Sequence, residues 1–258
     1  MEYTNVLVDR QEQVGIITLN RPQAMNTFNV PFAQELNAAL WEMENDPGVR
    51  VVVIDANGKH FSVGISLDEF KGKSHKEYNE FIHLMDEHNL TIARMKKPVI
   101  ASVKGYALAN GAGLSFACDL TVAAEDAKFG TTAINVGLIC LGPAAPLVRN
   151  VGRKKALEMV LTGDMITAAE AQRLGLVNRV VPADKLEEAT LELAKKLAAK
   201  SPLALQAGKA GIYGMQDMPY SQAIDMLGDR FAALCCTEDA EEGVKAFLDK
   251  RTPEWRQC

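Results

Sequence analysis

Residues 97–118, KPVIASVKGYALANGAGLSFAC, hold the pattern that decides the fold. The mostly apolar run at 98–103 is typical of a strand that is buried on both faces of a sheet. A glycine-rich turn at 109–113 follows it. Glycine lets such a turn expose backbone N–H groups. The pair Gly111 and Gly113 lacks the strand–turn–helix context of a dinucleotide-binding motif, so we expect no nicotinamide or flavin site.

Strands and helices alternate on both sides of this stretch. Apolar runs at 14–19, 51–54 and 120–123 predict further strands, which together with the intervening helical segments indicate an α/β fold. The second half is mostly helical: residues 186–199 are amphipathic, and Ser201-Pro202 is a typical helix start. We expect an α/β core at 1–195 and a helical C-terminal lobe at 196–258.

Two further helix starts follow from side-chain chemistry. Thr167 and Glu170 match a capping box, in which the threonine and glutamate side chains satisfy each other's backbone N–H groups. Thr237 precedes the acidic residues Glu238 and Asp239, which suit the positive end of a helix dipole. Asp119 is predicted to be structural, at a junction between a helix and a strand.

The composition excludes several classes of function. The 258 residues carry a formal charge of −5, which provides no field to attract nucleic acid. No apolar run is long enough to cross a membrane, and we find no signal peptide, so a cytoplasmic location is predicted. The five cysteines are odd in number and irregularly spaced, and the four histidines form no ligand pattern with them, so no disulfide framework and no metal site are expected.

Short motifs recur along the whole chain in a fixed order. They are LNRP at 19–22, MN at 25–26, DP at 46–47, VRVVV at 49–53, FSVGISL at 61–67, KPVIA at 97–101, GYA at 105–107, CDL at 118–120, FG at 129–130, LTG at 161–163, AEA at 169–171, GLV at 175–177, VP at 181–182 and FLDKR at 247–251. Together they resemble the crotonase (enoyl-CoA hydratase/isomerase) superfamily. The resemblance implies a crotonase-like spiral of ββα units with a helical C-terminal trimerisation lobe.

The resemblance also implies an oxyanion hole for an acyl-CoA thioester. Fixed N–H donors stabilise the negative oxygen of an enolate, and one donor contributes a few kcal/mol. By position, the two donors are the backbone N–H groups of Ile65 and Asn110. The family usually has glycine where Asn110 stands, and asparagine is among the residues that best tolerate unusual backbone angles. The alternative is that Gly64 and Gly111 only permit close packing of helix and sheet.

The same resemblance suggests which residues contact the CoA moiety. They are Gln23, Ala24, Met25, Val63, Ser66, Leu67, Asp68, Phe247 and Lys250. In the family, the C-terminal positions reach the CoA of a neighbouring subunit, and Arg251 beside Lys250 would add positive charge for phosphates. The alternative is a solvated basic pair at the end of a helix. No cofactor is expected beyond the CoA moiety of the substrate.

The chain departs from the family pattern at the acid–base residues. Typical hydratases activate water between two glutamates, but the matching positions here are Gly113 and Ala133, and the aspartate of some isomerases falls near Cys140-Leu141. Cys140 is a candidate acid, base or nucleophile, against the alternative of a buried and inert thiol. Four polar residues on a predicted helix over the acyl pocket are further candidates to replace the glutamates: His83, Asp86, Glu87 and His88. We expect at least three of the four side chains to lie on a solvated face of that helix.

Three functional hypotheses follow. The leading one is an acyl-CoA-processing enzyme of the enoyl-CoA hydratase/isomerase class, a lyase or isomerase with atypical acid–base residues. The second is an acyl-CoA decarboxylase or thioesterase on the same scaffold, because decarboxylation needs an oxyanion hole but little base. The third is a non-catalytic CoA-binding protein. In each case the expected partners are an acyl-CoA thioester and copies of the same chain, as a homotrimer or hexamer, with no nucleic acid and no membrane.

Overall fold

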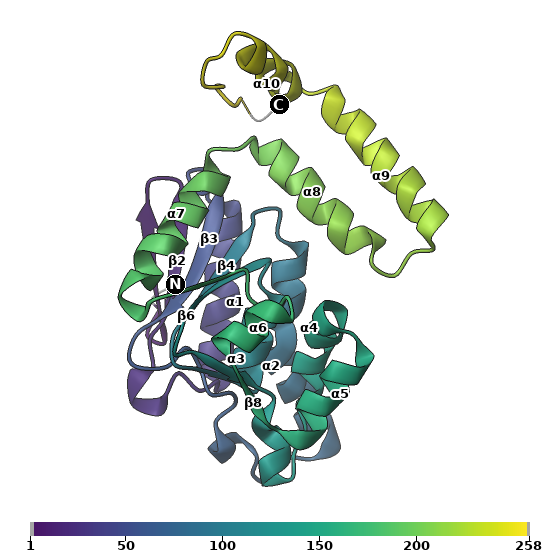
Figure 1. Cartoon of the computed structure of the whole chain (residues 1–258). Helices are drawn as coiled ribbons and strands as arrows, with labels where there is room; N and C mark the ends of the chain where they lie inside the picture. Colours follow the sequence, from purple (N-terminus) through teal and green to yellow (C-terminus); the bar gives the residue numbers. More distant parts are fainter. Residues whose placement is uncertain (1–2, 257–258) are drawn as a thin grey trace.

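Six strands form the larger sheet of the computed structural model, which describes residues 3–256 (Figure 1). Their order is β1-β2-β3-β4-β6-β9; β1 is antiparallel to β2, and each other neighbouring pair is parallel. Parallel pairing requires a long crossover, which the intervening helices supply. The strands are β1 (Val6–Gln11), β2 (Val14–Leu19), β3 (Val51–Ala56), β4 (Val99–Val103), β6 (Leu120–Ala124) and β9 (Arg179–Val181).

Both faces of this sheet are buried, which explains its apolar strands. Along β3, Val52 and Ile54 pack into a cluster with α1 and α2, whereas Val51 and Val53 pack into another with Leu193 of α7. The prediction of doubly buried strands is therefore confirmed. The two helices on the first face and the one on the second are α1 (Val30–Asn45), α2 (His75–Arg94) and α7 (Leu186–Ala198).

A second, smaller sheet carries the loops of the site. It contains β5 (Tyr106–Leu108), β7 (Lys128–Gly130) and β8 (Met165–Thr167), in that order. Single β-bridges extend it, from Ser62 to Ala107 and from Phe28 to Ile65. Strand pairs followed by a helix recur along the core, as expected for a spiral of ββα units.

The remaining helices begin largely where the sequence predicts. The Ser201 and Thr237 hydroxyls accept backbone N–H groups at the starts of α8 and α10, and the Thr167 hydroxyl accepts the N–H of Glu170. A reciprocal capping box forms between Ser74 and Glu77 at the start of α2, which the sequence analysis missed. These helices are α3 (Asn110–Ala117), α4 (Leu141–Val151), α5 (Arg153–Thr162), α6 (Ala168–Arg173), α8 (Pro202–Met215), α9 (Tyr220–Cys235) and α10 (Glu238–Leu248).

Helices α8 to α10 form an arm that leaves the core (Figure 1). The expected boundary between 195 and 196 falls inside α7, which packs on the sheet as far as Ala198. On the arm, the ammonium group of Lys209 lies 2.7 Å from Asp119, whose carboxylate also accepts the N–H of Val99. Asp119 thus has the structural role predicted for it and holds α8 to the core. No helix within residues 3–256 has the length and apolar character needed to span a bilayer.

Candidate functional site

One large cavity, of about 1060 Å³, is lined by loops and helix ends of the core. Its wall comes from the segment after β3, from one side of α2, from the start of α3 and from the chain between β7 and α4. Most of the side chains in this wall are apolar, as is usual for ligand sites. The few polar groups that face the cavity therefore decide its chemistry.

Ile65 contributes the first of these groups through its backbone. Phe28 forms hydrogen bonds with both neighbours of Ile65. Its N–H donates to the carbonyl oxygen of Gly64 at 2.8 Å, and its carbonyl oxygen accepts the N–H of Ser66 at 2.8 Å. Ile65 itself donates its N–H to no partner in the described chain. Gly64 adopts a φ of +103°, a backbone conformation that glycine adopts without strain. An unpaired N–H on a cavity wall is costly unless a ligand satisfies it.

Asn110 contributes the second backbone donor. It is the first residue of α3, and within residues 3–256 its N–H has no partner. A Cβ added to Gly64 would lie 3.5 Å from the Asn110 nitrogen, so the two donor segments are adjacent. The N–H groups at a helix start also carry the positive end of the helix dipole. The two residues predicted from the resemblance therefore line one cavity, and neither N–H group has a partner among residues 3–256.

The expected reason for asparagine at this position is wrong. Asn110 belongs to a helix, and the unusual backbone angles fall on the preceding Ala109, with φ +47° and ψ −121°. A non-glycine residue in this region stores strain that the surrounding structure must hold. The side chain of Asn110 instead donates its amide Nδ2–H to the Oδ1 of Asp86 at 3.0 Å.

Asp86 provides the carboxylate of the cavity. Tyr78, Ile82 and Asp86 follow one another at intervals of four residues along α2 and form a stripe on the wall. No other aspartate or glutamate of residues 3–256 lines this cavity. Burial raises the pKa of Asp86 to about 6, against the opposing effects of the Asn110 hydrogen bond and nearby His83.

This placement corrects the expectation for the four polar residues of α2. Only His83 and Glu87 are exposed, instead of three or more. His88 is fully buried beside the ring of Phe28, and burial lowers its pKa to about 4, so that it is neutral at pH 7. The four-residue spacing of Tyr78, Ile82 and Asp86 could have indicated that Asp86 shares a helix face with them. The other polar residues nearby made the whole segment resemble a solvated face.

Cys140 also lines the cavity, immediately before α4. Burial raises the pKa of its thiol, despite a hydrogen bond with the Ala133 backbone that acts in the opposite direction. A thiol with a raised pKa is a poor nucleophile at neutral pH, because the thiolate is the reactive form. The catalytic role predicted for Cys140 therefore gains no support from its surroundings.

The two positions expected to lack glutamates differ in their surroundings. Ala133 lies on the cavity wall. Gly113 is buried in α3, and a Cβ there would approach the Cγ of Pro143 to 2.9 Å. A side chain at Gly113 would thus displace the start of α4. The packing of Pro143 on Gly113 leaves no room for a carboxylate there.

The predicted CoA contacts divide into three groups. Met25, Val63, Ser66 and Leu67 line the cavity. Gln23 and Ala24 belong to the short helical turn Pro22–Ala24 just before Met25, and Asp68 is exposed and paired with Lys71 at 2.8 Å. Phe247 and Lys250 lie on the arm and do not line this cavity. Arg251 pairs with Glu242 at 2.6 Å, so its charge is already partnered. Within residues 3–256, no three His, Cys, Asp or Glu side chains are grouped to hold a metal ion.

Two adjacent N–H groups without partners, on a mostly apolar cavity wall, are an arrangement that suits a negatively charged oxygen. The protein-family model described as enoyl-CoA hydratase/isomerase matches residues 9–258. The chain is 38% identical to a probable enoyl-CoA hydratase of Rhizobium meliloti, covering 99% of both chains. It is also 38% identical to the 2,3-dehydroadipyl-CoA hydratase of Escherichia coli, covering 98% of this chain and 99% of the relative.

The solved structures include an enoyl-CoA hydratase of Mycobacterium smegmatis that superposes with a TM-score of 0.94. It is 40% identical in sequence, and the match covers 98% of this chain and 99% of that one. The chain therefore belongs to the enoyl-CoA hydratase/isomerase family, the crotonase superfamily.

Replacing Gly64 by alanine should destabilise the site. The new Cβ would meet the Cβ of Ala109 at 2.6 Å, in a backbone conformation that alanine rarely adopts. We expect a loss of about 1–3 kcal/mol in the free energy of unfolding, measured by urea denaturation. Gly72→Ala is the matched control, because Gly72 also has a positive φ but no atom lies within 4 Å of the place its Cβ would take. Equal losses in both variants would contradict the close approach at Ala109.

Proposed function

We propose that this protein is an acyl-CoA-processing enzyme of the hydratase/isomerase class that stabilises the enolate of a thioester. The observation that supports this proposal is the pair of unpartnered N–H groups, on Ile65 and Asn110, in the wall of one apolar cavity. Both donors are backbone groups fixed by strand pairing or helix geometry. They need no rearrangement when negative charge develops on the oxygen, which is the condition for a large electrostatic contribution.

In this proposal the thioester carbonyl oxygen accepts both N–H groups. The acyl chain then extends into the apolar part of the cavity, toward Ile82 and Ile134. Loss of a proton beside the carbonyl creates an enolate, whose oxygen the two donors already hold. The absence of glutamates at Gly113 and Ala133 removes groups that would each contribute about 100- to 10,000-fold to hydration. The proposed chemistry therefore centres on the enolate.

The CoA moiety is proposed to leave the cavity past Met25, Val63, Ser66 and Leu67. Gln23, Ala24 and Asp68 flank that route in the chain. No cofactor beyond this CoA is proposed, and the proposed location is cytoplasmic. Phe247 and Lys250 are proposed to complete the nucleotide site of a neighbouring copy.

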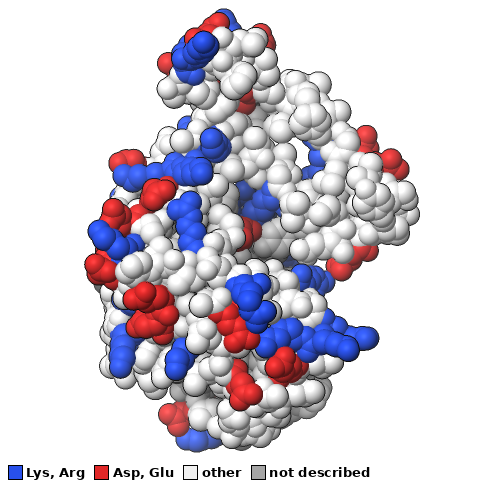
Figure 2. All heavy atoms as spheres, in the orientation of Figure 1, with Lys and Arg blue, Asp and Glu red and all other residues white. Residues whose placement is uncertain are grey.

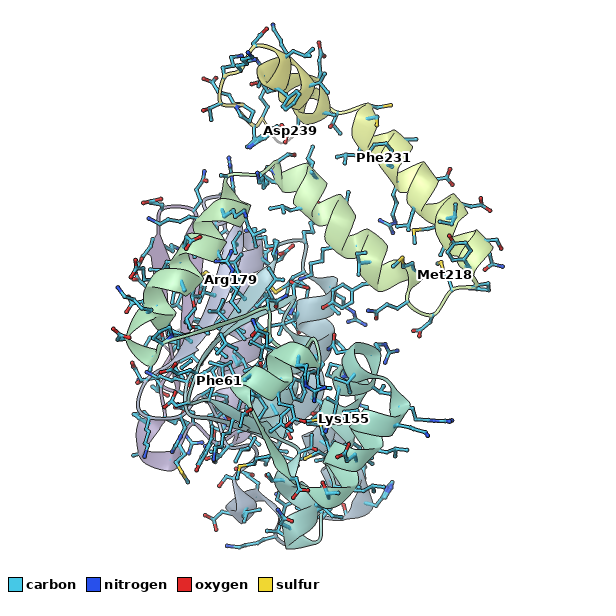
Figure 3. The ribbon with its side chains drawn as sticks, viewed as in Figure 1. Phe61, Lys155, Arg179, Met218, Phe231 and Asp239 are labelled. Atoms are coloured by element: carbon cyan, nitrogen blue, oxygen red, sulfur yellow. The ribbon has the colours of Figure 1, made fainter. Side chains whose placement is uncertain are left out.

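We propose a homotrimer, or a hexamer of two trimers, as the assembled form. The arm exposes large apolar side chains that one chain leaves uncovered, and its middle shows few charges (Figure 2). Met218 and Phe231 lie on this arm, far from the packed core around Phe61 (Figure 3). The most exposed of the apolar arm residues are Tyr220, Phe231, Val244, Phe247 and Leu248. Such a surface is typical of subunit interfaces.

Sedimentation equilibrium tests the assembly. The expected mass is three or six times that of the 28.1 kDa chain. Phe231→Asp should reduce it, because an unpaired charge in an apolar interface is costly. A wild-type protein that sediments as a monomer at micromolar concentration would contradict the proposed assembly.

Ile65→Pro tests the proposed function, because proline has no backbone N–H. With crotonyl-CoA as substrate, we expect turnover to fall about 100- to 1,000-fold when one donor is lost. Turnover is followed by loss of the conjugated thioester absorbance, with the product identified by mass. Ile65→Val keeps the N–H and should retain most of the activity.

The outcomes separate the hypotheses. Unchanged turnover in a folded Ile65→Pro protein would contradict the assigned oxyanion hole. Binding of crotonyl-CoA without turnover by the wild type would shift the assignment to decarboxylation, thioester hydrolysis or CoA binding without catalysis. Release of CO2 from a malonyl-type CoA would then identify the first of these.

A further inference from the structure

The carboxylate of Asp86 lies where three helices meet at the cavity wall. It extends from α2, contacts the side chain of Asn110 at the start of α3, and rests against Gly142 in the first turn of α4. Asn110 thus has two parts in this arrangement. Its side chain binds Asp86, and its backbone N–H is the second proposed oxyanion donor. The carboxylate is therefore held close to the place where a thioester oxygen would bind.

Only one oxygen of this carboxylate is used within the protein. Oδ1 accepts the Nδ2–H of Asn110 at 3.0 Å, and Oδ2 has no hydrogen-bond partner among the described residues. No Lys, Arg or His of residues 3–256 forms an ion pair with Asp86. Asp86 is half-buried and lines the cavity, so its free oxygen is accessible to a ligand bound there.

Gly142 provides the room for this carboxylate. A Cβ at Gly142 would collide with both oxygens of Asp86, because they lie directly against its Cα. Glycine at this position thus leaves room for a side chain from another helix in the orientation that Asp86 has in the structure. The carboxylate therefore lies between its hydrogen-bond partner Asn110 and the open space beside Gly142.

The surroundings suit proton transfer near neutral pH. Burial raises the pKa of Asp86 to about 6, so at pH 7 the group is mostly ionised and is a stronger base than an ordinary aspartate. The titratable groups near it are His83 and Tyr78 on α2 and Cys140 before α4. Burial also raises the pKa of the Cys140 thiol, which keeps it neutral while Asp86 ionises.

We infer that Asp86 is the catalytic acid–base group of this site, which removes and returns a proton on the carbon beside the thioester carbonyl. This inference rests on the proposed function. Oδ2 takes the proton, the electron pair of the C–H bond forms the carbon–carbon double bond of the enolate, and the carbonyl electron pair moves onto the oxygen. The N–H groups of Ile65 and Asn110 hold that oxygen. The reverse step returns the proton to the same carbon, or to the γ carbon of an unsaturated chain, which moves its double bond.

Exchange of the α protons of butyryl-CoA in D2O tests the step without requiring a net reaction. The assembled wild-type protein should introduce deuterium, detected by mass, at a rate that rises with pH through about 6 and then levels. Asp86→Asn preserves size and should reduce the rate about 100-fold or more and abolish this pH dependence. Glu87→Gln, an exposed neighbour on the same helix, should exchange at the wild-type rate.

A second variant moves the carboxylate without removing it. Gly142→Ala should displace Asp86 and also reduce exchange, and Asp86→Glu should restore part of the rate that Asp86→Asn loses. Butyryl-CoA binding by calorimetry should remain within a few-fold of wild type in Asp86→Asn, which separates proton transfer from binding.

The other outcomes overturn the inference in distinguishable ways. If Asp86→Asn exchanges at the wild-type rate while Ile65→Pro loses exchange, the catalytic role of Asp86 is contradicted and the proposed function still holds. If the wild-type protein binds butyryl-CoA but does not exchange its α protons, the proton-transfer role of Asp86 is also contradicted. A wild-type protein that does not bind butyryl-CoA would contradict the proposed function itself.

Discussion

Two backbone N–H groups that the fold leaves unpaired are the constraint on which the site depends. Pairing of buried backbone groups is nearly universal in proteins, so an unpaired donor on a cavity wall has to be held there by its surroundings. For Ile65, the bonds of Phe28 to both neighbouring residues do this. For Asn110, the helix does it, since the first N–H groups of a helix have no internal acceptor.

The cost of this arrangement appears in the residues around the donors. Ala109 has a backbone conformation that is rare for a residue with a side chain, and Gly64 must be glycine to lie against it. Gly111 packs directly on the backbone carbonyl of Ser62, which brings α3 up to the second sheet. Close packing, the alternative interpretation of Gly64 and Gly111, is therefore present at both glycines, and it is compatible with the proposed role of the donors.

The sequence was sufficient for the architecture, because apolar runs such as 51–54 follow directly from burial on both faces. A resemblance that spans the chain also led to Ile65 and Asn110, and the structure brings both residues to one cavity. The role proposed for Asp86 could not be recognised in this way, because the argument for it depends on how α2 docks against α3 and α4. Its contact with Gly142 joins residues that are distant in sequence. The backbone angles of Ala109 were missed because they follow from the approach of Gly64, which no local pattern indicates.

The most direct test of the oxyanion hole is the infrared stretch of the bound thioester carbonyl. Butyryl-CoA labelled with ¹³C at the carbonyl carbon isolates this band from the protein amide bands in a difference spectrum. Two N–H donors polarise the carbonyl, so we expect its frequency to be lower when bound than in water, and Ile65→Pro to reverse much of the decrease. A bound carbonyl with the frequency it has in water would contradict the central claim.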